Sequence, residues 1–182
     1  EVIAVGVSER TNSVAVELLA EALAALDEGP RWLEIVHLPH RRAYMHLDTV
    51  FTMVDRSVFN VFPGLLDEID VHVITPDGSD LAVDRADGLE TALRATLGLE
   101  EITLVVTGGD VIGQLREQWD DGNNTLAIAP GVVVAYERNQ ETNRRLRDAG
   151  IEVLELDASE LCRGRGGSRC MTQPLLRDPV VQ

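Results

Sequence analysis

The sequence predicts an α/β fold built by repetition, a pseudo-symmetric α/β propeller in which strand–helix–strand units surround an axis. Short β-branched runs alternate with stretches whose apolar residues follow helical spacing, a pattern typical of α/β proteins. The stretches VIAVGVSERTN at 2–12 and GVVVAYERNQETN at 131–143 each run from a strand through Glu-Arg into a helix with an early Asn. No Pro/Gly/Ser-rich linker interrupts the 182 residues, so we expect a single domain.

The first third of the chain reads as strand, helix, strand, loop and strand. We expect a strand at residues 2–7 and then a helix that Asn12 or Ser13 can cap through its side-chain oxygen. A second strand follows at residues 32–38. A polar loop then leads to a third strand at residues 49–54.

The rest of the chain continues the alternation. Strands are expected at residues 71–75 and 102–106, on either side of a helix at residues 88–97 that Gly98 ends. The polar run at 120–124 is typical of a turn, and it leads into a hairpin with strands at residues 125–129 and 131–136.

The two similar stretches also match beyond their helices. Each helix ends in glycine and is followed by a similar strand, Leu-Glu-Ile-Val in the first copy and Ile-Glu-Val-Leu in the second. A polar loop comes next, and it carries His46 in the first copy and Cys170 in the second. In a pseudo-symmetric propeller these two residues would converge near the axis.

Composition excludes several classes of function. The excess of 31 Asp+Glu over 16 Lys+Arg gives a net charge of −15, which argues against nucleic acid or an anionic membrane and favours a cationic small molecule or a protein partner. Two cysteines make no disulfide framework and suit a reducing compartment, so we expect a cytoplasmic protein. The chain lacks an initiator Met and begins inside an expected strand, so we expect residues upstream of it.

The tetrapeptide Met45-His46-Leu47-Asp48 is a candidate for acid–base chemistry. At the entry to a strand, His46 and Asp48 would share one face, placing an imidazole beside an acceptor for a cationic group. The alternative is an ordinary surface histidine and a turn aspartate.

The segment at 164–170 combines glycines and arginines just before the thiol of Cys170. Nearby arginines lower the pKa of a thiol, and the thiolate is the nucleophilic form. The alternative is a mobile loop with a buried cysteine. Other classes of site are disfavoured: the glycines do not open a helix as a phosphate cradle requires, and Pro39 breaks any helix that would align His37 and His40 on a metal.

Taken together, the sequence resembles the arginine deiminase family. The matching segments are SERTN at 8–12, MHLDTVFTMVD at 45–55, REQWDDGNNTLAIAPGVVVAYERN at 116–139, AGIEV at 149–153 and GRGGSRCMTQP at 164–174. The resemblance implies the five-bladed α/β propeller of the guanidino-group-modifying (pentein) superfamily. Residues 1–182 would be the C-terminal part of one catalytic domain, roughly its last half or more.

The resemblance also implies the chemistry and a role for each site residue. L-Arginine would be hydrolysed to L-citrulline and ammonia without a metal or organic cofactor. Cys170 would attack the guanidinium carbon, His46 would protonate the departing ammonia and activate water, and Asp48 would hold guanidinium nitrogens. The implied substrate-binding residues are completed by Arg10, which would grip the α-carboxylate, and by Gly164 and Arg165 of a gating loop.

Two departures from the family pattern stand out. Gln173 replaces a second cysteine found in many members. The family also uses an Asp and a Glu from N-terminal segments, the Glu within Glu-Gly-Gly-Asp, and Thr107-Gly-Gly-Asp110 does not replace that stretch. We therefore expect the isolated chain to be inactive and to associate with an N-terminal segment, a companion chain or another copy in a homo-oligomer.

Other functions remain open at this point. Within the superfamily they are dimethylarginine hydrolysis, agmatine or peptidyl-arginine deimination, and amidino transfer. From a different class, the chain could be a non-catalytic arginine-binding or interaction fragment with the same fold.

Overall fold

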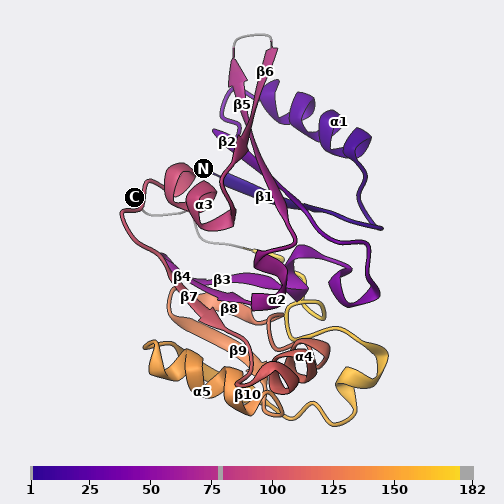
Figure 1. The fold of residues 1–182 in the computed structure, drawn as a ribbon, viewed down its shortest axis with the longest axis vertical. Coiled ribbons are helices and arrows are strands. Elements are labelled where there is room, and N and C mark those ends of the chain that lie inside the picture. The colour runs from indigo at the N-terminus through magenta and orange to yellow at the C-terminus, as the bar shows by residue number, and fades with distance from the viewer. Residues whose placement is uncertain (1, 78–79, 177–182) are drawn as a thin grey trace.

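The computed structural model describes residues 2–77 and 80–176 and shows an α/β fold with three separate sheets (Figure 1). The four-stranded sheet has the order β1-β2-β5-β6, and the two three-stranded sheets have the orders β3-β4-β7 and β8-β9-β10. The four-stranded sheet (the upper sheet) forms the upper part of the molecule in Figure 1. The sheet β3-β4-β7 (the middle sheet) and the sheet β8-β9-β10 (the lower sheet) lie together in the lower part. The expected α/β class is confirmed.

The element bounds agree with most of the expected segments. The strands are β1 Val2–Val7, β2 Trp32–His37, β3 Phe51–Asp55, β4 Val58–Val61, β5 Asp70–Asp77, β6 Asp80–Ala86, β7 Thr103–Val106, β8 Leu126–Ala129, β9 Val132–Tyr136 and β10 Glu152–Leu156. The α-helices are α1 Ser13–Ala24, α2 Pro63–Leu66, α3 Leu89–Leu97, α4 Val111–Trp119 and α5 Gln140–Asp148. Strands β4 and β6 and helices α2 and α4 were not expected. No helix in the described ranges is long and apolar enough to cross a membrane.

The predicted internal repeat is confirmed as two parallel strand–helix–strand units. In the first, β1 pairs with β2 from Val2–Trp32 onward, with α1 between them in sequence. In the second, β9 pairs with β10 from Val132–Glu152 onward, with α5 between them. Each unit returns the chain to the same end of its sheet, so the loops that follow β2 and β10 begin at corresponding places.

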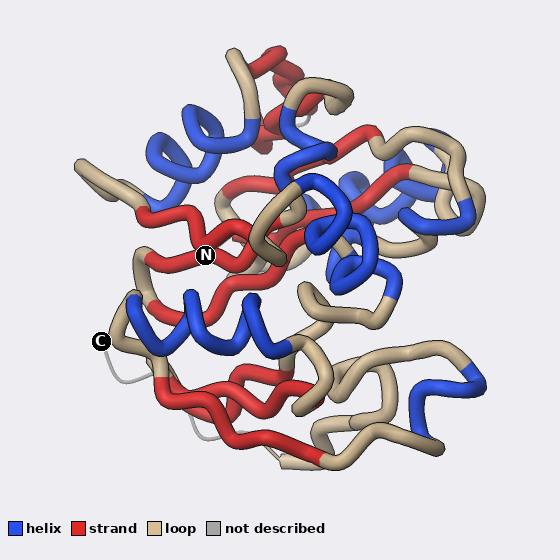
Figure 2. The backbone as a smooth tube through the Cα atoms, turned by 60° about the horizontal axis from the view of Figure 1, so that its bottom comes forward, coloured by secondary structure: helices blue, strands red, loops and turns tan. Residues whose placement is uncertain are grey.

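The middle sheet contains a third parallel pair, and a long crossover joins its strands. After β4 the chain leaves this sheet, passes through α2, and adds β5 and β6 as an antiparallel hairpin to the upper sheet. Helix α3 then returns the chain to β7, which pairs in parallel with β4 (Figure 1). Figure 2 shows the backbone from another side, with helices in blue and strands in red. The continuous segment from β4 to β7 therefore contributes strands to both the upper and the middle sheet.

Helix ends form as their sequence signals predict. The side chain of Asn12 caps α1 by accepting a hydrogen bond from Ala15 N at 2.9 Å. Helix α3 ends at Gly98, whose φ of 66° is the left-handed conformation that glycine adopts without a steric penalty.

One predicted boundary is wrong at a place that matters for the site. The third strand begins at Phe51, because residues Leu47–Thr49 form a 3₁₀ turn instead of the expected strand start. The carbonyl of His46 accepts hydrogen bonds from both the backbone and the side chain of Thr49, at 3.2 and 2.7 Å. His46 and Asp48 therefore do not alternate on a strand, and the strand-face argument for pairing them fails.

In the upper sheet, strand β2 is buried on both faces. Leu33 and Ile35 of β2 pack with Val16 of α1 on one face. Val36, whose side chain lies on the opposite face from those of Leu33 and Ile35, packs in the cluster that includes Leu93 of α3. A charged residue, Glu34, also lies on the α3 face and is fully buried.

Burial of Glu34 provides a test of the fold through stability. Its carboxyl receives a hydrogen bond from the Thr96 hydroxyl, and its Oε2 has no partner within the described residues. Burial raises the pKa of Glu34, and the hydrogen bond from Thr96 offsets part of that rise. The folded state thus holds this proton more tightly than the unfolded chain, so the free energy of unfolding falls as pH rises above the unfolded-state value of 4.5.

We expect Glu34→Gln to remove this pH dependence. The stability of the variant relative to the parent should rise between pH 4.5 and pH 7.5, by up to about 1.4 kcal/mol for each pKa unit by which burial raises Glu34. Urea unfolding at the two pH values measures the difference. A difference that does not change with pH would show that Glu34 titrates equally in both states.

Candidate active site

Asp48 lies in the loop that follows the first repeat unit. The 3₁₀ turn Leu47–Thr49 holds its backbone, and its side chain is about a third exposed, at 29%. The Oδ2 atom pairs with Arg169 Nε at 3.1 Å, while Oδ1 is buried without a hydrogen-bond partner in the described part of the chain. One carboxylate oxygen is thus occupied by a guanidinium of the protein itself.

Cys170 lies in the loop that follows the second repeat unit, and that loop is tied to the lower sheet. Ser168 donates its hydroxyl to the carbonyls of Val134 and Asn124, at 2.7 and 3.1 Å. Gly167 lies so close to Asn124 that a Cβ would approach the Asn124 side chain to 2.6 Å. The backbone before Cys170 is therefore fixed against β9 and the turn at Asn124, while the cysteine is exposed.

The side chain of Asn124 joins these two loops. Its Oδ1 accepts a hydrogen bond from Cys170 N at 3.0 Å, and its Nδ2 donates to the carbonyl of Asp48 at 3.2 Å. Asn124 is almost fully buried, which favours one fixed arrangement. The structure thus brings Asp48 and Cys170 together from opposite ends of the chain.

The turn that carries Asn124 is itself anchored to the middle sheet. Asn60 of β4 donates to the carbonyl of Gly122 at 2.9 Å and accepts from the Asn123 side chain at 3.0 Å. Thr52 of β3 donates to the carbonyl of Asn123 at 2.7 Å. These bonds satisfy buried polar groups of the turn and hold it against β3 and β4.

The electrostatic environment of Cys170 differs from the expected one. Although Cys170 is exposed as a residue, the loops packed around it partly desolvate its thiol. This desolvation raises the pKa of the Cys170 thiol, and the negative charges of Asp48 and Asp121 raise it further. Hydrogen bonds from Gly167 and Asn124 act in the opposite direction. The prediction that neighbouring arginines lower this pKa is therefore wrong for the free chain, because carboxylates and burial outweigh them.

The remaining predicted residues lie around this centre with different partners. Arg10 lies in the turn after β1, with its Nη2 3.8 Å from the sulfur of Met45, beside His46. The Arg165 guanidinium stacks on the ring of Trp119, 3.9 Å from its centroid. Gly164 is exposed with open space around it. His46 is exposed, and no hydrogen bond or ion pair in the described ranges joins it to Cys170.

Sequence reasoning missed the residues that assemble this centre. Asn124 and Asp121 belong to the polar run at 120–124, which reads as a turn and is one, but both side chains are buried against the Cys170 loop. Arg169 was treated only as one of several cationic residues near the thiol. In a sequence, a polar run before an apolar hairpin predicts an exposed turn and does not indicate that the polar side chains are buried.

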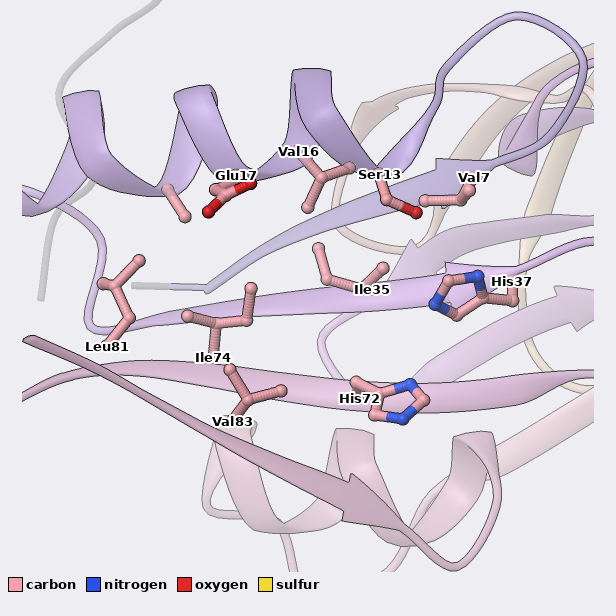
Figure 3. A pocket seen from close by; sticks show the side chains of 11 residues that line it. Val7, Ser13, Val16, Glu17, Ile35, His37, His72, Ile74, Leu81 and Val83 are labelled. Carbon is pink, nitrogen blue, oxygen red and sulfur yellow. The ribbon is translucent and has the colours of Figure 1, made fainter.

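Two cavities differ in their relation to these residues. One, of about 1020 Å³, is lined by Asp48 and Arg169, by the 172–174 segment and by β8, so it adjoins the Asp48–Cys170 pair. Another, of about 420 Å³, lies between α1 and the upper sheet and is mostly apolar (Figure 3). His37 and His72 lie at one end of it with their rings 5.3 Å apart, and none of the predicted site residues lines it.

Comparison with known proteins gives a consistent family. The arginine deiminase family model matches residues 1–177. The arginine deiminase of Latilactobacillus sakei subsp. sakei is 45% identical over 185 aligned residues that cover 99% of this chain, and that of Mycobacterium bovis is 49% identical over 98% of it. The chain spans 45% and 44% of the lengths of these two relatives, less than half of each.

Solved structures with similar folds are more distant in sequence. An amidinotransferase from Microseira wollei superposes with a TM-score of 0.66 at 16% identity, over 98% of this chain and 46% of that one. The cyanobacterial arginine dihydrolase ArgZ gives a TM-score of 0.59 at 15% identity, over 96% of this chain and 23% of that one. At these identities the likeness establishes the fold alone.

Proposed function

Because the chain belongs to the arginine deiminase family, we propose that the complete protein hydrolyses L-arginine to L-citrulline and ammonia at the Cys170 centre. The observation that carries the proposal is the bridge through Asn124, which joins the backbone of Cys170 to that of Asp48 and so supports a thiol nucleophile close to a carboxylate. A guanidinium is a poor electrophile because its charge is delocalised. A soft sulfur nucleophile and a carboxylate that localises the charge meet that difficulty.

The proposed reaction proceeds through a covalent intermediate. The Cys170 thiolate bonds to the guanidinium carbon, and the carbon–nitrogen bond breaks as His46 gives a proton to the departing ammonia. Water, deprotonated by His46, then attacks the thiouronium carbon. The carbon–sulfur bond breaks, citrulline is released, and the thiolate is restored.

The substrate itself would help to activate the thiol, because it binds against Asp48. In the free chain the charge of Asp48 helps to raise the pKa of Cys170. A guanidinium bound against Asp48 offsets that charge and brings a positive charge to the sulfur, so binding favours the thiolate. The Cys170 thiolate is then favoured when the guanidinium that it attacks is bound.

The remaining roles follow the family resemblance and are part of the same proposal. Arg10 binds the substrate α-carboxylate from the Met45 side of the site. Gly164 and Arg165 belong to the gating loop beside Cys170. The cytoplasmic location predicted from cysteine usage remains a prediction.

We also propose that residues 1–182 are the C-terminal part of one catalytic domain whose complete fold is a five-bladed propeller. Two observations support this: the repeated parallel units, and relatives more than twice as long as the matched stretch. The missing blades would supply the further Asp and Glu of the family's site. A homo-oligomer of the complete protein remains the expectation.

Residues 1–182 alone are expected to show no arginine turnover. Asp48 is the site carboxylate that this chain offers, since Asp121 is buried and bonded to Gly166. The measurement is ammonia release from arginine by mass-verified 1–182 and by the complete protein. Turnover by the isolated chain would contradict the proposed division of the site.

The same assay tests the alternatives within the superfamily. Agmatine should react far more slowly than arginine, because it lacks the α-carboxylate that Arg10 is proposed to bind. Methylated arginines keep that group, so their turnover at the rate of arginine would favour dimethylarginine hydrolysis. Amidino transfer from arginine to an added amine acceptor would favour the function of the amidinotransferase neighbour. Arginine binding without turnover by the complete protein would favour a non-catalytic role.

A further inference from the structure

The turn after α4 contains a buried carboxylate to which no function has been given. Asp121 follows Trp119, the last residue of α4, by two positions and is only 6% exposed. Its φ of 60° is left-handed, a conformation that Asp and Asn tolerate better than most residues. The turn is fixed further by Gly122, whose N–H donates to the carbonyl of Glu117 at 2.7 Å.

The side chains of this turn hold the loop that leads to Cys170. Asp121 Oδ2 accepts a hydrogen bond from Gly166 N at 3.2 Å. Trp119 carries the Arg165 guanidinium on its ring. Both Arg165 and Gly166 have left-handed backbones, with φ values of 67° and 107°. The least favourable backbone of the loop thus lies where Asp121 and Trp119 contact it.

Arg165 is held by stacking and charge more than by hydrogen bonds. Its Nε and Nη1 are buried and have no hydrogen-bond partner within the described residues. Its positive charge is close enough to Asp121 to lower the pKa of that carboxyl, against the larger effect of burial, which raises it. Arg165 is therefore a partly buried cation that stacks on an aromatic ring and lies close enough to the Asp121 carboxylate to affect its pKa.

A purely structural role does not require a charge at position 121. An asparagine would also tolerate the left-handed turn and accept the hydrogen bond from Gly166. The aspartate instead places a negative charge in a buried setting, where Asp120 and Asp48 both raise its pKa further. Burying a charge costs free energy. We therefore take the aspartate charge to serve the neighbouring Arg165 cation.

We propose that Asp121 and Trp119 are positioning residues that fix Arg165 and the backbone of Gly166 beside Cys170, so that Arg165 is ready to bind the anionic end of the substrate. This inference rests on the proposed function, because it assigns Arg165 to substrate binding. Neither residue touches the reacting atoms. Their removal should therefore weaken binding and leave the chemical steps largely intact.

The first test is Asp121→Asn in the complete protein. We expect KM for arginine to rise roughly tenfold while kcat changes by less than about threefold, the pattern of lost binding that is equal in ground and transition states. Trp119→Leu should raise KM by a similar factor. Asp120→Asn is the matched control, since Asp120 pairs with Arg138 at 3.3 Å and makes no hydrogen bond to Gly166. It should leave both constants within about twofold.

A second readout separates charge from structure. The titratable groups near Cys170 are Asp48 after β2, Asp121 after α4, and Tyr136 on β9. Asp121→Asn removes one of the two negative charges that raise the thiol pKa, so the midpoint of Cys170 alkylation against pH should move down. Trp119→Leu should leave that midpoint in place. Iodoacetamide labelling, followed by mass spectrometry of the peptide that carries Cys170, measures it.

The outcomes distinguish this inference from the proposed function. If the parent protein does not turn over arginine, the proposed function fails, but the alkylation midpoint still reports whether Asp121 faces Cys170. If the parent is active and both variants keep the parental KM and alkylation midpoint, the positioning role is wrong. Should Asp121→Asn fail to fold, as judged by circular dichroism, an unchanged KM in Trp119→Leu would overturn the proposal.

Discussion

Cys170→Ala in the complete protein is expected to reduce kcat/KM for arginine by at least ~10⁴-fold, because the carbon–sulfur bond of the intermediate can no longer form. The sulfur of Cys170 is the predicted nucleophile, and Asn124 holds the Cys170 backbone beside that of Asp48. Citrulline formation measures the loss. Arginine binding by calorimetry should persist, since the side chain contributes little to holding the loop.

Cys162→Ser is the matched control for this prediction. The sulfur of Cys162 lies 2.9 Å from Arg138 Nη1 in the short turn Leu161–Gly164, and no site role is proposed for it. Its replacement should leave kcat/KM within about threefold, the size of effect expected away from the reacting atoms. Equal losses from the two substitutions would mean that Cys170 is not the nucleophile.

Asp48→Asn should lower kcat/KM by at least ~10²-fold, the range expected when a charge-assisted contact to a reacting group is lost. Asparagine keeps the shape of the side chain but cannot localise the guanidinium charge. At the same time the pKa of the Cys170 thiol should fall, because Asp48 helps to raise it. Alkylation of Cys170 at neutral pH should then become faster while turnover becomes slower.

Misfolding would also lower the alkylation midpoint, because it would remove the burial that raises the thiol pKa. Circular dichroism and thermal unfolding of Asp48→Asn that match the parent would therefore attribute the opposite changes to the lost charge. The structural alternative is that Asp48 serves only as the partner of Arg169. In that case Arg169→Gln would cost as much activity as Asp48→Asn, and thermal stability would fall in both. We expect Arg169→Gln to be much milder, since its side chain is half exposed and such ion pairs contribute little.

The repeat units of the fold are predictable because each rests on local signals. Asn12 caps α1 as its position suggests, Gly98 ends α3, and β-branched runs form β1, β2, β9 and β10. Other elements depend on long-range packing. Strand β4 is only four residues long and buries Asn60, whose partners come from the turn at Gly122 and Asn123. The sequence of Val58–Val61 does not indicate that Asn60 will be buried or which residues will bind it.

The residues of the candidate site also fall into two groups, those that the local sequence predicts and those that only long-range contacts reveal. Cys170 and Asp48 are found because their neighbours in sequence belong to recognisable motifs. Asn124 and Asp121 act through contacts with residues more than 40 positions away, such as Gly166 and Cys170, so their role emerges only from the fold. The thiol environment was misjudged for a related reason. Counting arginines near Cys170 in sequence overlooked burial and two carboxylates that approach it in space.

The crossover between β4 and β7 has a consequence for how the molecule folds. Val58 can pair with Thr103 only when the intervening segment has closed, and the cost of closing a loop grows with its length. The local hairpins β5–β6 and β8–β9 should therefore form early, and the middle sheet should form late. Since Thr52 and Asn60 of that sheet anchor the turn that carries Asn124, the Asp48–Cys170 bridge belongs to the last part of the chain to assemble. A destabilising change in the distant upper sheet would then slow maturation of the site without touching any of its residues.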